Sequence, residues 1–368
     1  MGRGHLQGYS SVTKVAILGG NGQVGAETAI YLSTLVGVPV VCLIRSEYSA
    51  ALLRLVGVDY RVVDYSDISM LQQALSDCDV VADFRYPLGE LVDILKESKK
   101  NIAAAIGSMR AGSRYVFMSS IMALGMPDGA SKVKEHSVPR TSYSYIKRES
   151  ERFALKMGRR AGMPVFLFRL GQVHGVLQGV SQEYVVAFSA GRVRVNGAPE
   201  DPTTAVFACS VGEALLRCTK DLAPDLYTVV CSPQWTLAEL HSYYQIRYKL
   251  KASVEYATAQ PQSSIRWGFM SLVGALRSGL MSRRGLLETY ILLPFPALFR
   301  EFKGRYRVAR ARIEATGSPL NRATIIHNLL GRVPGGTVKG IPASLDEVVA
   351  VEQRLERIID AAIRRGEK

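Results

Sequence analysis

The feature that most constrains this chain is a short apolar run (VAIL) that ends in a glycine-rich loop, GGNGQVG, at residues 19–25. A helix-compatible stretch up to residue 35 follows the loop. Gly19 permits the tight turn from strand to helix, Gly22 lets the backbone approach a pyrophosphate, and Gly25 lets helix and strand pack closely. Glycines at this spacing between a strand and a helix predict a binding loop for a dinucleotide.

The start of the helix after this loop gives a second reason to expect phosphates there. The first N–H groups of a helix have no partner within the helix, and its positive dipole end favours anions. The alternative is a glycine loop that binds no ligand. We expect the loop and the first helical turn to hold the cofactor through Gly19, Gly22, Gln23, Val24 and Gly25.

Strand-like and helix-like segments alternate through the first half of the chain, which is typical of a parallel sheet with helices on both faces. After the first strand we expect strands at residues 38–44, 61–64, 79–84, 115–119 and 165–169, and helices at 67–75, 88–108 and 144–158. Six strands with helical crossovers predict an α/β fold, a Rossmann-type doubly wound parallel sheet with its ligand at the carboxyl edge. Beyond residue 175 we expect helices at 205–219, 236–244 and 345–364 and a strand at 227–231.

Composition limits the partners of the chain. No uninterrupted apolar run reaches the ~18 residues that a membrane span needs, so we expect no transmembrane segment. The five cysteines include no CxxC pair, which is typical of reduced thiols; we expect a cytoplasmic protein without a metal site.

The positive charge of the chain is concentrated in its second half. The net charge is +14, and residues 264–340 hold thirteen Lys or Arg against three Glu and no Asp. Such a surplus attracts a nucleotide, a phosphopantetheine carrier protein, nucleic acid or an anionic membrane, or it is only a solvated surface. Nothing in the sequence except its positive charge favours binding to nucleic acid, so we do not expect nucleic acid as a partner.

The end of the second expected strand indicates which nicotinamide dinucleotide is bound. A carboxylate there accepts hydrogen bonds from the adenosine ribose of NAD, whereas a basic residue pairs with the 2′-phosphate of NADP. The strand ends in Arg45 and Ser46, with no carboxylate before Glu47. A guanidinium suits a phosphate and Ser46 adds a hydroxyl, so NADP(H) is predicted; the alternative is a solvent-facing Arg45. Asp64, placed to accept from the adenine amino group, and Tyr65 are further cofactor contacts.

Three residues carry the expected chemistry. Tyr143 and Lys147 are four apart in an expected helix, so they share one face. A nearby ammonium lowers the pKa of a phenol, so we expect Tyr143 to exchange a proton with an alcohol or carbonyl oxygen. Ser120, at the carboxyl end of the neighbouring strand, hydrogen-bonds the same oxygen, and Lys147 also holds the nicotinamide ribose. A Tyr-x-x-x-Lys spacing is common by itself and becomes specific together with the glycine loop and this serine.

These motifs resemble those of the extended short-chain dehydrogenases/reductases, in the nucleotide-sugar epimerase/dehydratase-like branch. Residues 18–25 resemble the T-G-x-x-G-x-x-G motif of that branch, with Leu18 in place of Thr. Tyr143 and Lys147 resemble its catalytic pair, and residues 169–175 (RLGQVHG) resemble its R-x-x-N-V-Y-G turn.

The resemblance also implies how the chain is organised. We expect an NADP(H)-binding Rossmann domain at residues 11–175, to which residues 205–232 return. A smaller, mostly helical substrate lobe is then made of residues 176–204 and 233–368. Members of the family commonly pair through a helix bundle of the cofactor lobe, so the resemblance implies a homodimer.

Departures from the family pattern bear on the substrate. Ile121 and Met122 follow Ser120 where sugar 4,6-dehydratases have an Asp-Glu pair, so that elimination lacks its acid and base. Gln172 and His174 stand where sugar-nucleotide enzymes usually have Asn and Tyr. We expect His174 to be a packed, hydrogen-bonded residue and not a proton relay.

A further departure lies at the end of the fourth strand. The chain reads Asp83-Phe84-Arg85-Tyr86 where the family usually has His-Leu-Ala-Ala beside the cofactor. Arg85 places a cation near the cofactor phosphates or an anionic substrate, so it is a candidate cofactor contact. The alternative is an ion pair with Asp83 or a solvent-facing side chain.

Together these features predict an NADP(H)-dependent oxidoreductase with a Ser/Tyr/Lys mechanism. It reduces a carbonyl, or oxidises the alcohol, of a small substrate that is anionic or linked to a carrier. One alternative is a nucleotide-sugar epimerase that oxidises and re-reduces its substrate with a tightly held cofactor. The other is a non-catalytic NADP(H)-sensing protein, although a sensor needs no complete Ser/Tyr/Lys set.

Overall fold

The computed structural model describes residues 13–257, except 88, 90, 128, 129 and 131, together with residues 325–326, 328–334, 337–338 and 344–366. Most of the basic segment 264–340 lies outside the described residues. None of the helices in the described part has both the length and the apolar composition that a membrane span requires.

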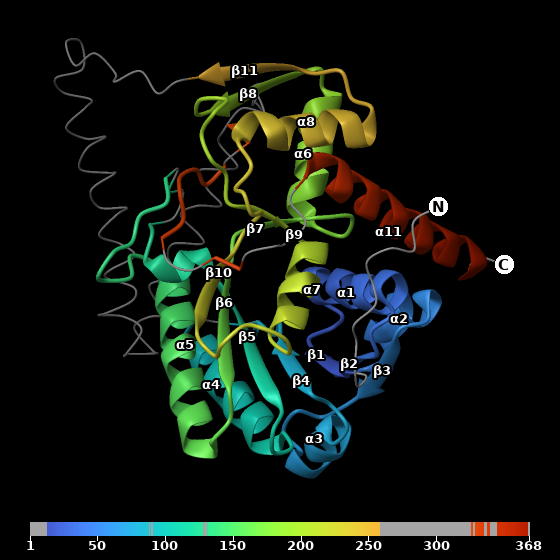
Figure 1. Cartoon of the computed structure of the whole chain (residues 1–368), viewed down its shortest axis with the longest axis vertical. Helices are drawn as coiled ribbons and strands as arrows, with labels where there is room; N and C mark the ends of the chain where they lie inside the picture. The colour runs from blue at the N-terminus through green and yellow to red at the C-terminus, as the bar shows by residue number, and fades with distance from the viewer. Residues whose placement is uncertain are drawn as a thin grey trace, which may run out of the picture.

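A seven-stranded sheet, parallel throughout, forms the centre of the protein (Figure 1). Its order is β10-β6-β5-β4-β1-β2-β3, so the direction of winding reverses between β1 and β4, where ligands bind at the carboxyl ends of the strands. The predicted Rossmann-type doubly wound sheet is thereby confirmed. The strands are β1 (Val15–Leu18), β2 (Val40–Ile44), β3 (Asp59–Val62), β4 (Val80–Asp83), β5 (Arg114–Ser120), β6 (Val165–Leu170) and β10 (Leu226–Val229).

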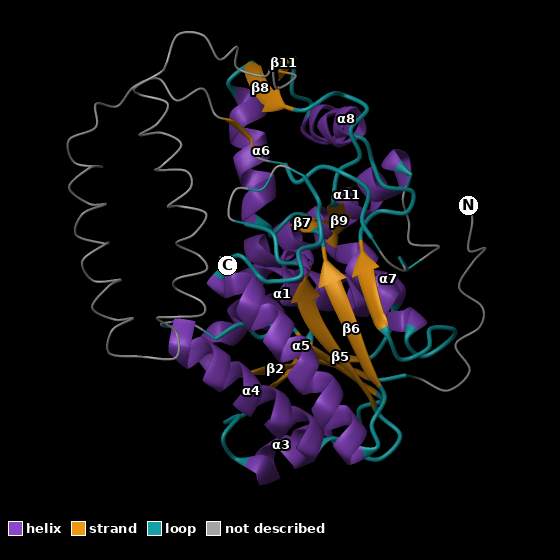
Figure 2. Ribbon diagram, turned by 90° about the vertical axis from the view of Figure 1, so that its left-hand side faces the viewer, coloured by secondary structure: helices purple, strands orange, loops and turns teal. Residues whose placement is uncertain are grey.

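Helices cover both faces of the sheet, because successive side chains of a buried strand point to opposite faces. Val15 and Ile17 lie in one buried cluster with α1, α2 and α7, whereas Ala16 and Leu18 lie in a second cluster with α3, α4 and α5. Figure 2 shows the two helical layers from the side. The helices are α1 (Gln23–Ile30, continued by a π-helical stretch Tyr31–Val36), α2 (Ala51–Val56), α3 (Ile68–Leu75), α4 (Leu91–Ser108), α5 (Ser142–Ala161) and α7 (Ala208–Arg217).

Two predicted segments were wrong in detail. The third strand lies at Asp59–Val62 and not at 61–64, because residues 59–62 pair with the end of β2. Residues 205–219 are not one helix, because Ala205–Phe207 form strand β9, which pairs with β7 (Gln172–His174) before α7 begins. A short apolar run has no periodicity that separates a buried strand from a buried helix, and here a partner distant in sequence decides.

The region beyond β7 contains the predicted helices, one helix that was not predicted (α6), and a second, smaller sheet. Helix α6 (Gly179–Ser189) and helix α8 (Leu237–Tyr248) pack beside a parallel sheet in the order β11-β8-β12. Its strands are β8 (Arg192–Asn196), β11 (Ser253–Ala257) and β12 (Ile325–Ile326). The predicted start of α8 is correct: the Thr236 hydroxyl and the Glu239 carboxylate form a reciprocal capping box.

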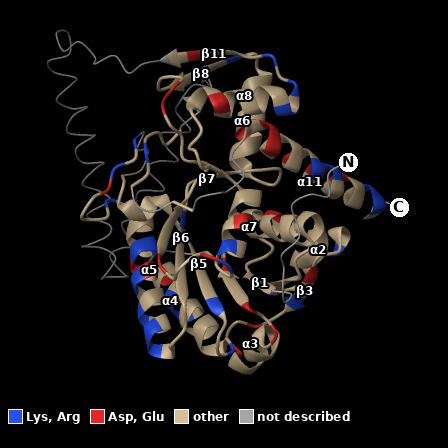
Figure 3. Cartoon of the chain, viewed as in Figure 1, with Lys and Arg blue, Asp and Glu red and all other residues tan. Residues whose placement is uncertain are grey.

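Part of the positive charge is displayed on one helix. Lys and Arg residues recur along α5, where they are coloured blue in Figure 3. Arg152, Lys156 and Arg160 are exposed and follow one another at intervals of four residues, so they form one solvated face, and Arg159 beside them is also exposed.

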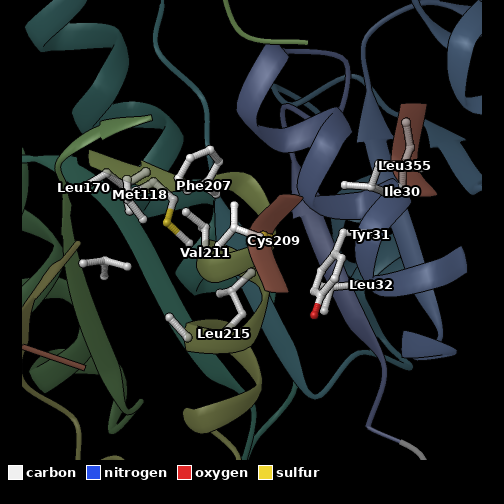
Figure 4. Packing of buried hydrophobic residues seen from close by; sticks show 14 of the residues in the cluster. Ile30, Tyr31, Leu32, Met118, Leu170, Phe207, Cys209, Val211, Leu215 and Leu355 are labelled. Atoms are coloured by element: carbon white, nitrogen blue, oxygen red, sulfur yellow. The ribbon is translucent and has the colours of Figure 1, made fainter. Parts of the chain in front are cut away.

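The last helix, α11 (Leu345–Gly366), returns to the sheet domain and packs against α2 and α8. Leu355 belongs to the same buried cluster as Ile30 and Tyr31 at the end of α1 (Figure 4). The C-terminal helix is therefore part of the core that supports the glycine loop.

Two buried carboxyl groups join α11 to α1. Glu27 accepts hydrogen bonds from the N–H groups of Val176 (2.8 Å) and Leu177 (3.0 Å) and from the Gln178 amide (2.7 Å). Glu352 is fully buried beside it, and burial together with the charge of Glu27 raises the pKa of Glu352 well above its ordinary range. Because Glu27 has the three donors, Glu27 carries the charge and Glu352 carries the proton.

Replacing Glu352 by Gln tests this pair. The raised pKa keeps Glu352 neutral in the folded protein while it ionises in the unfolded chain, so the free energy of unfolding falls as the pH rises from 4.5 through the folded-state pKa. The Gln variant has no proton to lose. We expect its free energy of unfolding to exceed that of the wild type by about 1–3 kcal/mol at pH 8, with the difference shrinking toward pH 4.5.

Chemical denaturation at both pH values measures this difference, and Asp360→Asn, an exposed position on the same helix, is the control. A Glu352→Gln variant that is less stable than the wild type at pH 8 contradicts the assignment of the proton.

Candidate active site at the carboxyl edge of the sheet

The glycine loop closes tightly over the end of β1. Gly19 has φ +79°, which favours glycine, and its carbonyl accepts a hydrogen bond from the N–H of Gly22 (3.0 Å). A Cβ on Gly25 would lie 2.7 Å from the Gly19 oxygen, so only glycine fits where the helix crosses the loop. These contacts are the roles predicted for Gly19 and Gly25.

The start of α1 is open to an anion. Gly22 is the N-cap residue, and no side chain caps the helix. The N–H groups of Gln23 and Val24 therefore point out of the first turn beside the glycine loop. This cradle fits the pyrophosphate of a dinucleotide.

The residues predicted to hold the adenosine half lie together at the ends of β2 and β3. Arg45 is exposed, and its side chain makes no hydrogen bond or ion pair with any residue that the structure describes; Ser46 beside it is also exposed. The Tyr65 hydroxyl donates to the carbonyl of Leu43 (2.6 Å). Asp64 is exposed, and one of its oxygens accepts from the N–H and hydroxyl of Ser66. That turn is local and leaves the second carboxylate oxygen of Asp64 for another donor.

Arg85 forms an ion pair with Asp83, which was the alternative to the predicted contact with the cofactor. Its Nε and Nη2 atoms donate to the two oxygens of Asp83 (2.8 and 2.7 Å), and its guanidinium lies 4.5 Å from the centre of the Tyr65 ring. The Arg85 side chain is only 8% exposed, and its Nη1 atom has no partner among the described residues. Its backbone nitrogen lies 3.2 Å from the position of a Cβ on Gly19, so Arg85 borders the glycine loop.

Ser120, Tyr143 and Lys147 meet at the carboxyl ends of β4 and β5. Ser120 is the last residue of β5, and its hydroxyl accepts from the N–H of Met122 (3.2 Å). Tyr143 lies in the first turn of α5, which the Thr141 hydroxyl caps, and Lys147 is one turn further on. The Ser120 side chain acts as a hydrogen-bond partner of the Tyr143 phenol and lowers its pKa.

Lys147 is buried, and its ammonium donates to the carbonyl of Met118 (3.1 Å). Burial lowers the pKa of Lys147 to about 8, and the carboxylates of Asp83 and Glu151 act against this shift. Glu151 in turn accepts from the Ser119 hydroxyl (2.6 Å) and from Arg169. The ammonium is therefore still charged at neutral pH.

The expected effect of Lys147 on Tyr143 was wrong. The pKa of Tyr143 is raised from 10.0 because the phenol is buried, and among the residues that the structure describes Ser120 acts against this shift. The Lys147 ammonium lies 5.9 Å from the centre of the Tyr143 ring and is engaged by Met118. Tyr143 is consequently protonated at neutral pH, which suits a proton donor.

Tyr86 is a site residue that the sequence argument did not assign. Its ring centre lies 5.4 Å from that of Tyr143 and 5.1 Å from the Lys147 ammonium. The signal was present in the chain, as a large aromatic residue two positions beyond Phe84 where the family usually has Ala.

His174 is a core residue, as expected. It is fully buried, its Nδ1 atom lies 2.6 Å from the Tyr244 hydroxyl, and burial lowers the pKa of His174 to about 3. Across the residues that the structure describes, no group of three His, Cys, Asp or Glu side chains is placed to hold a metal ion.

Comparison with known proteins finds one family whose model matches part of this chain. Residues 15–190, from β1 to the end of α6, match the NAD dependent epimerase/dehydratase family. The match covers just under half of the chain, so it shows a similarity to that family over this part of the sequence. Among curated proteins, none matches the sequence.

Solved structures of epimerases and dehydratases share the fold. UDP-N-acetylglucosamine 4-epimerase from Bacillus cereus is 17% identical, with a TM-score of 0.51 over 70% of this chain and 92% of that chain. UDP-glucuronic acid 4-epimerase from Bacillus cereus in complex with NAD is 12% identical, with a TM-score of 0.52 over 67% and 87%. dTDP-glucose 4,6-dehydratase from Bacillus anthracis in complex with NAD is 13% identical, with a TM-score of 0.51 over 67% and 85%. At this identity the likeness extends to the fold alone.

Replacing Gly25 by Ala tests the cradle. The added Cβ meets the Gly19 backbone at 2.7 Å, so we expect the free energy of unfolding to fall by about 1–3 kcal/mol and dinucleotide binding to weaken. Gly107→Ala is the matched control, because it also lies in a helix but its Cβ meets nothing within 4 Å. That variant should gain about 0.5–1 kcal/mol. Denaturation and ligand titration measure both effects, and a Gly25→Ala protein that binds as the wild type does contradicts the assignment.

Proposed function

We propose that this protein is an NADP(H)-dependent oxidoreductase that reduces a carbonyl group of a small substrate. The observation that carries the proposal is the meeting of Ser120, Tyr143 and Lys147 at the sheet edge that also holds the glycine loop. The match of residues 15–190 to an NAD dependent family supports a nicotinamide cofactor.

The side chains of the site divide the work of the reaction. A bound nicotinamide supplies the hydride, which goes to the carbonyl carbon. Tyr143, protonated at neutral pH, donates its proton to the carbonyl oxygen, and Ser120 hydrogen-bonds that oxygen. Ser120 also favours the phenolate that remains, which then takes a proton from solvent, and the Lys147 ammonium would hold the nicotinamide ribose.

The preference for NADP(H) rests on Arg45. Its guanidinium is exposed beside Ser46 and has no partner among the described side chains, so it is available to a 2′-phosphate. Solved structures with this fold include complexes with NAD, and a preference for NADP(H) would distinguish this chain from them.

A nucleotide-sugar epimerase is the second candidate, because several solved structures with this fold are sugar-nucleotide epimerases. An epimerase keeps its cofactor through purification and consumes no NADPH overall. The homodimer, the cytoplasmic location and the division into a cofactor domain and a substrate lobe stay predictions.

Tyr143→Phe tests the chemistry. Without the phenol no proton reaches the substrate oxygen, so we expect turnover to fall by about 10²–10⁴-fold while NADPH still binds. NADPH consumption across a panel of carbonyl compounds, together with NADPH titration, measures both quantities. The neighbouring Tyr145→Phe is the control. Full activity of the Tyr143→Phe protein overturns the proposed mechanism.

Arg45→Gln tests the cofactor preference. Loss of a charged hydrogen bond to the 2′-phosphate should raise the Kd for NADPH by about 10- to 100-fold and leave the Kd for NADH within about twofold. Arg54→Gln, an exposed arginine on α2, should change neither. Tighter binding of NADH than of NADPH by the wild type contradicts the assignment of Arg45.

A further inference from the structure

The surroundings of the Lys147 ammonium contain one polar partner and three aromatic rings. Nζ donates to the carbonyl of Met118, and it lies 5.1, 5.5 and 5.9 Å from the ring centres of Tyr86, Phe117 and Tyr143. No second hydrogen-bond acceptor for Nζ occurs among the described residues. The remaining N–H groups of the ammonium therefore face aromatic surface.

Of these rings, Tyr86 is the one that lies outside a helix or strand and is exposed to solvent. Phe117 is an inward residue of β5 and is 4% exposed, so it is fixed in the core. Tyr143 is held by helix α5 and is the proposed proton donor. Tyr86 follows β4 in an irregular segment, and 37% of its surface is exposed.

Tyr86 also lies between the two halves of the site. The backbone of Arg85, the preceding residue, borders Gly19 of the phosphate loop, and the ring of Tyr86 reaches Lys147 and Tyr143. A molecule that contacts both the glycine loop and Lys147 must therefore pass the Tyr86 ring.

We propose that Tyr86 covers the Lys147 ammonium and competes for it with the ribose that joins the cofactor's pyrophosphate to its nicotinamide, which makes Tyr86 a determinant of cofactor affinity. This inference rests on the proposed function, because it requires a dinucleotide that reaches Lys147. When the ribose hydroxyls bind the ammonium, the Tyr86 ring leaves it, and the lost cation–π contact weakens binding.

The affinities for NADPH and for a fragment that does not reach Lys147 test whether Tyr86 acts at the Lys147 ammonium. NADPH reaches Lys147, whereas adenosine 2′,5′-bisphosphate carries only the adenosine half of the cofactor. We expect Tyr86→Ala to bind NADPH about tenfold more tightly than the wild type, equivalent to loss of one cation–π contact. Tyr86→Phe keeps the ring and should match the wild type within about twofold. Adenosine 2′,5′-bisphosphate should bind all three proteins equally.

A double-mutant cycle tests whether the effect runs through the ammonium. In a Lys147→Met background there is no cation to uncover, so Tyr86→Ala should leave the Kd for NADPH unchanged. Calorimetric titration of the four proteins gives the coupling between the two side chains.

The outcomes separate the inference from the function on which it rests. Weaker binding of NADPH by Tyr86→Ala shows that the ring is a platform for the ligand and overturns the inference. So does an equal gain in the Lys147→Met background, or equal binding by Tyr86→Ala and the wild type; the proposed function survives these results. Absence of NADPH binding to every protein overturns the proposed function and the inference together.

Discussion

The charge of Lys147 in the protein interior is the feature on which the site depends. Two buried carboxylates, Asp83 at the end of β4 and Glu151 one turn further along α5, favour the charged ammonium against its burial. Each carboxylate also binds an arginine, Arg85 or Arg169, so neither is an uncompensated charge. The parallel strands β4, β5 and β6 end side by side and place these groups in one row along the sheet edge.

Another buried carboxylate with hydrogen-bond partners, Glu27, links helix α1 to helix α11. Glu27 of α1 accepts hydrogen bonds from the backbone of Val176 and Leu177 and interacts with Glu352 of α11. The phosphate-binding helix is thereby anchored both to the connection that follows β7 and to the C-terminal helix. Removal of α11 would expose to solvent the Glu27 carboxylate and the apolar side chains of α1 that α11 now covers.

The features of the fold and the site that depend on residues close in sequence could be predicted. The features that depend on contacts between distant residues could not. The glycine loop, the Tyr143/Lys147 spacing and the alternation of strands depend on neighbours in sequence, and the predicted sheet is confirmed. The sign of the pKa shift of Tyr143 depends on burial, which no spacing gives. The Glu27–Glu352 pair joins opposite ends of the chain, and Tyr86 acts through residues of two later elements.

In the proposed mechanism the phenol of Tyr143 acts on a substrate beside the nicotinamide of a dinucleotide whose pyrophosphate binds at the start of α1. A crystal structure of the protein with bound NADP(H) tests it most directly. We predict the pyrophosphate at the N–H groups of Gln23 and Val24 and the Tyr143 hydroxyl facing C4 of the nicotinamide ring. A cofactor bound elsewhere, or a Tyr143 hydroxyl directed away from that carbon, would contradict the account.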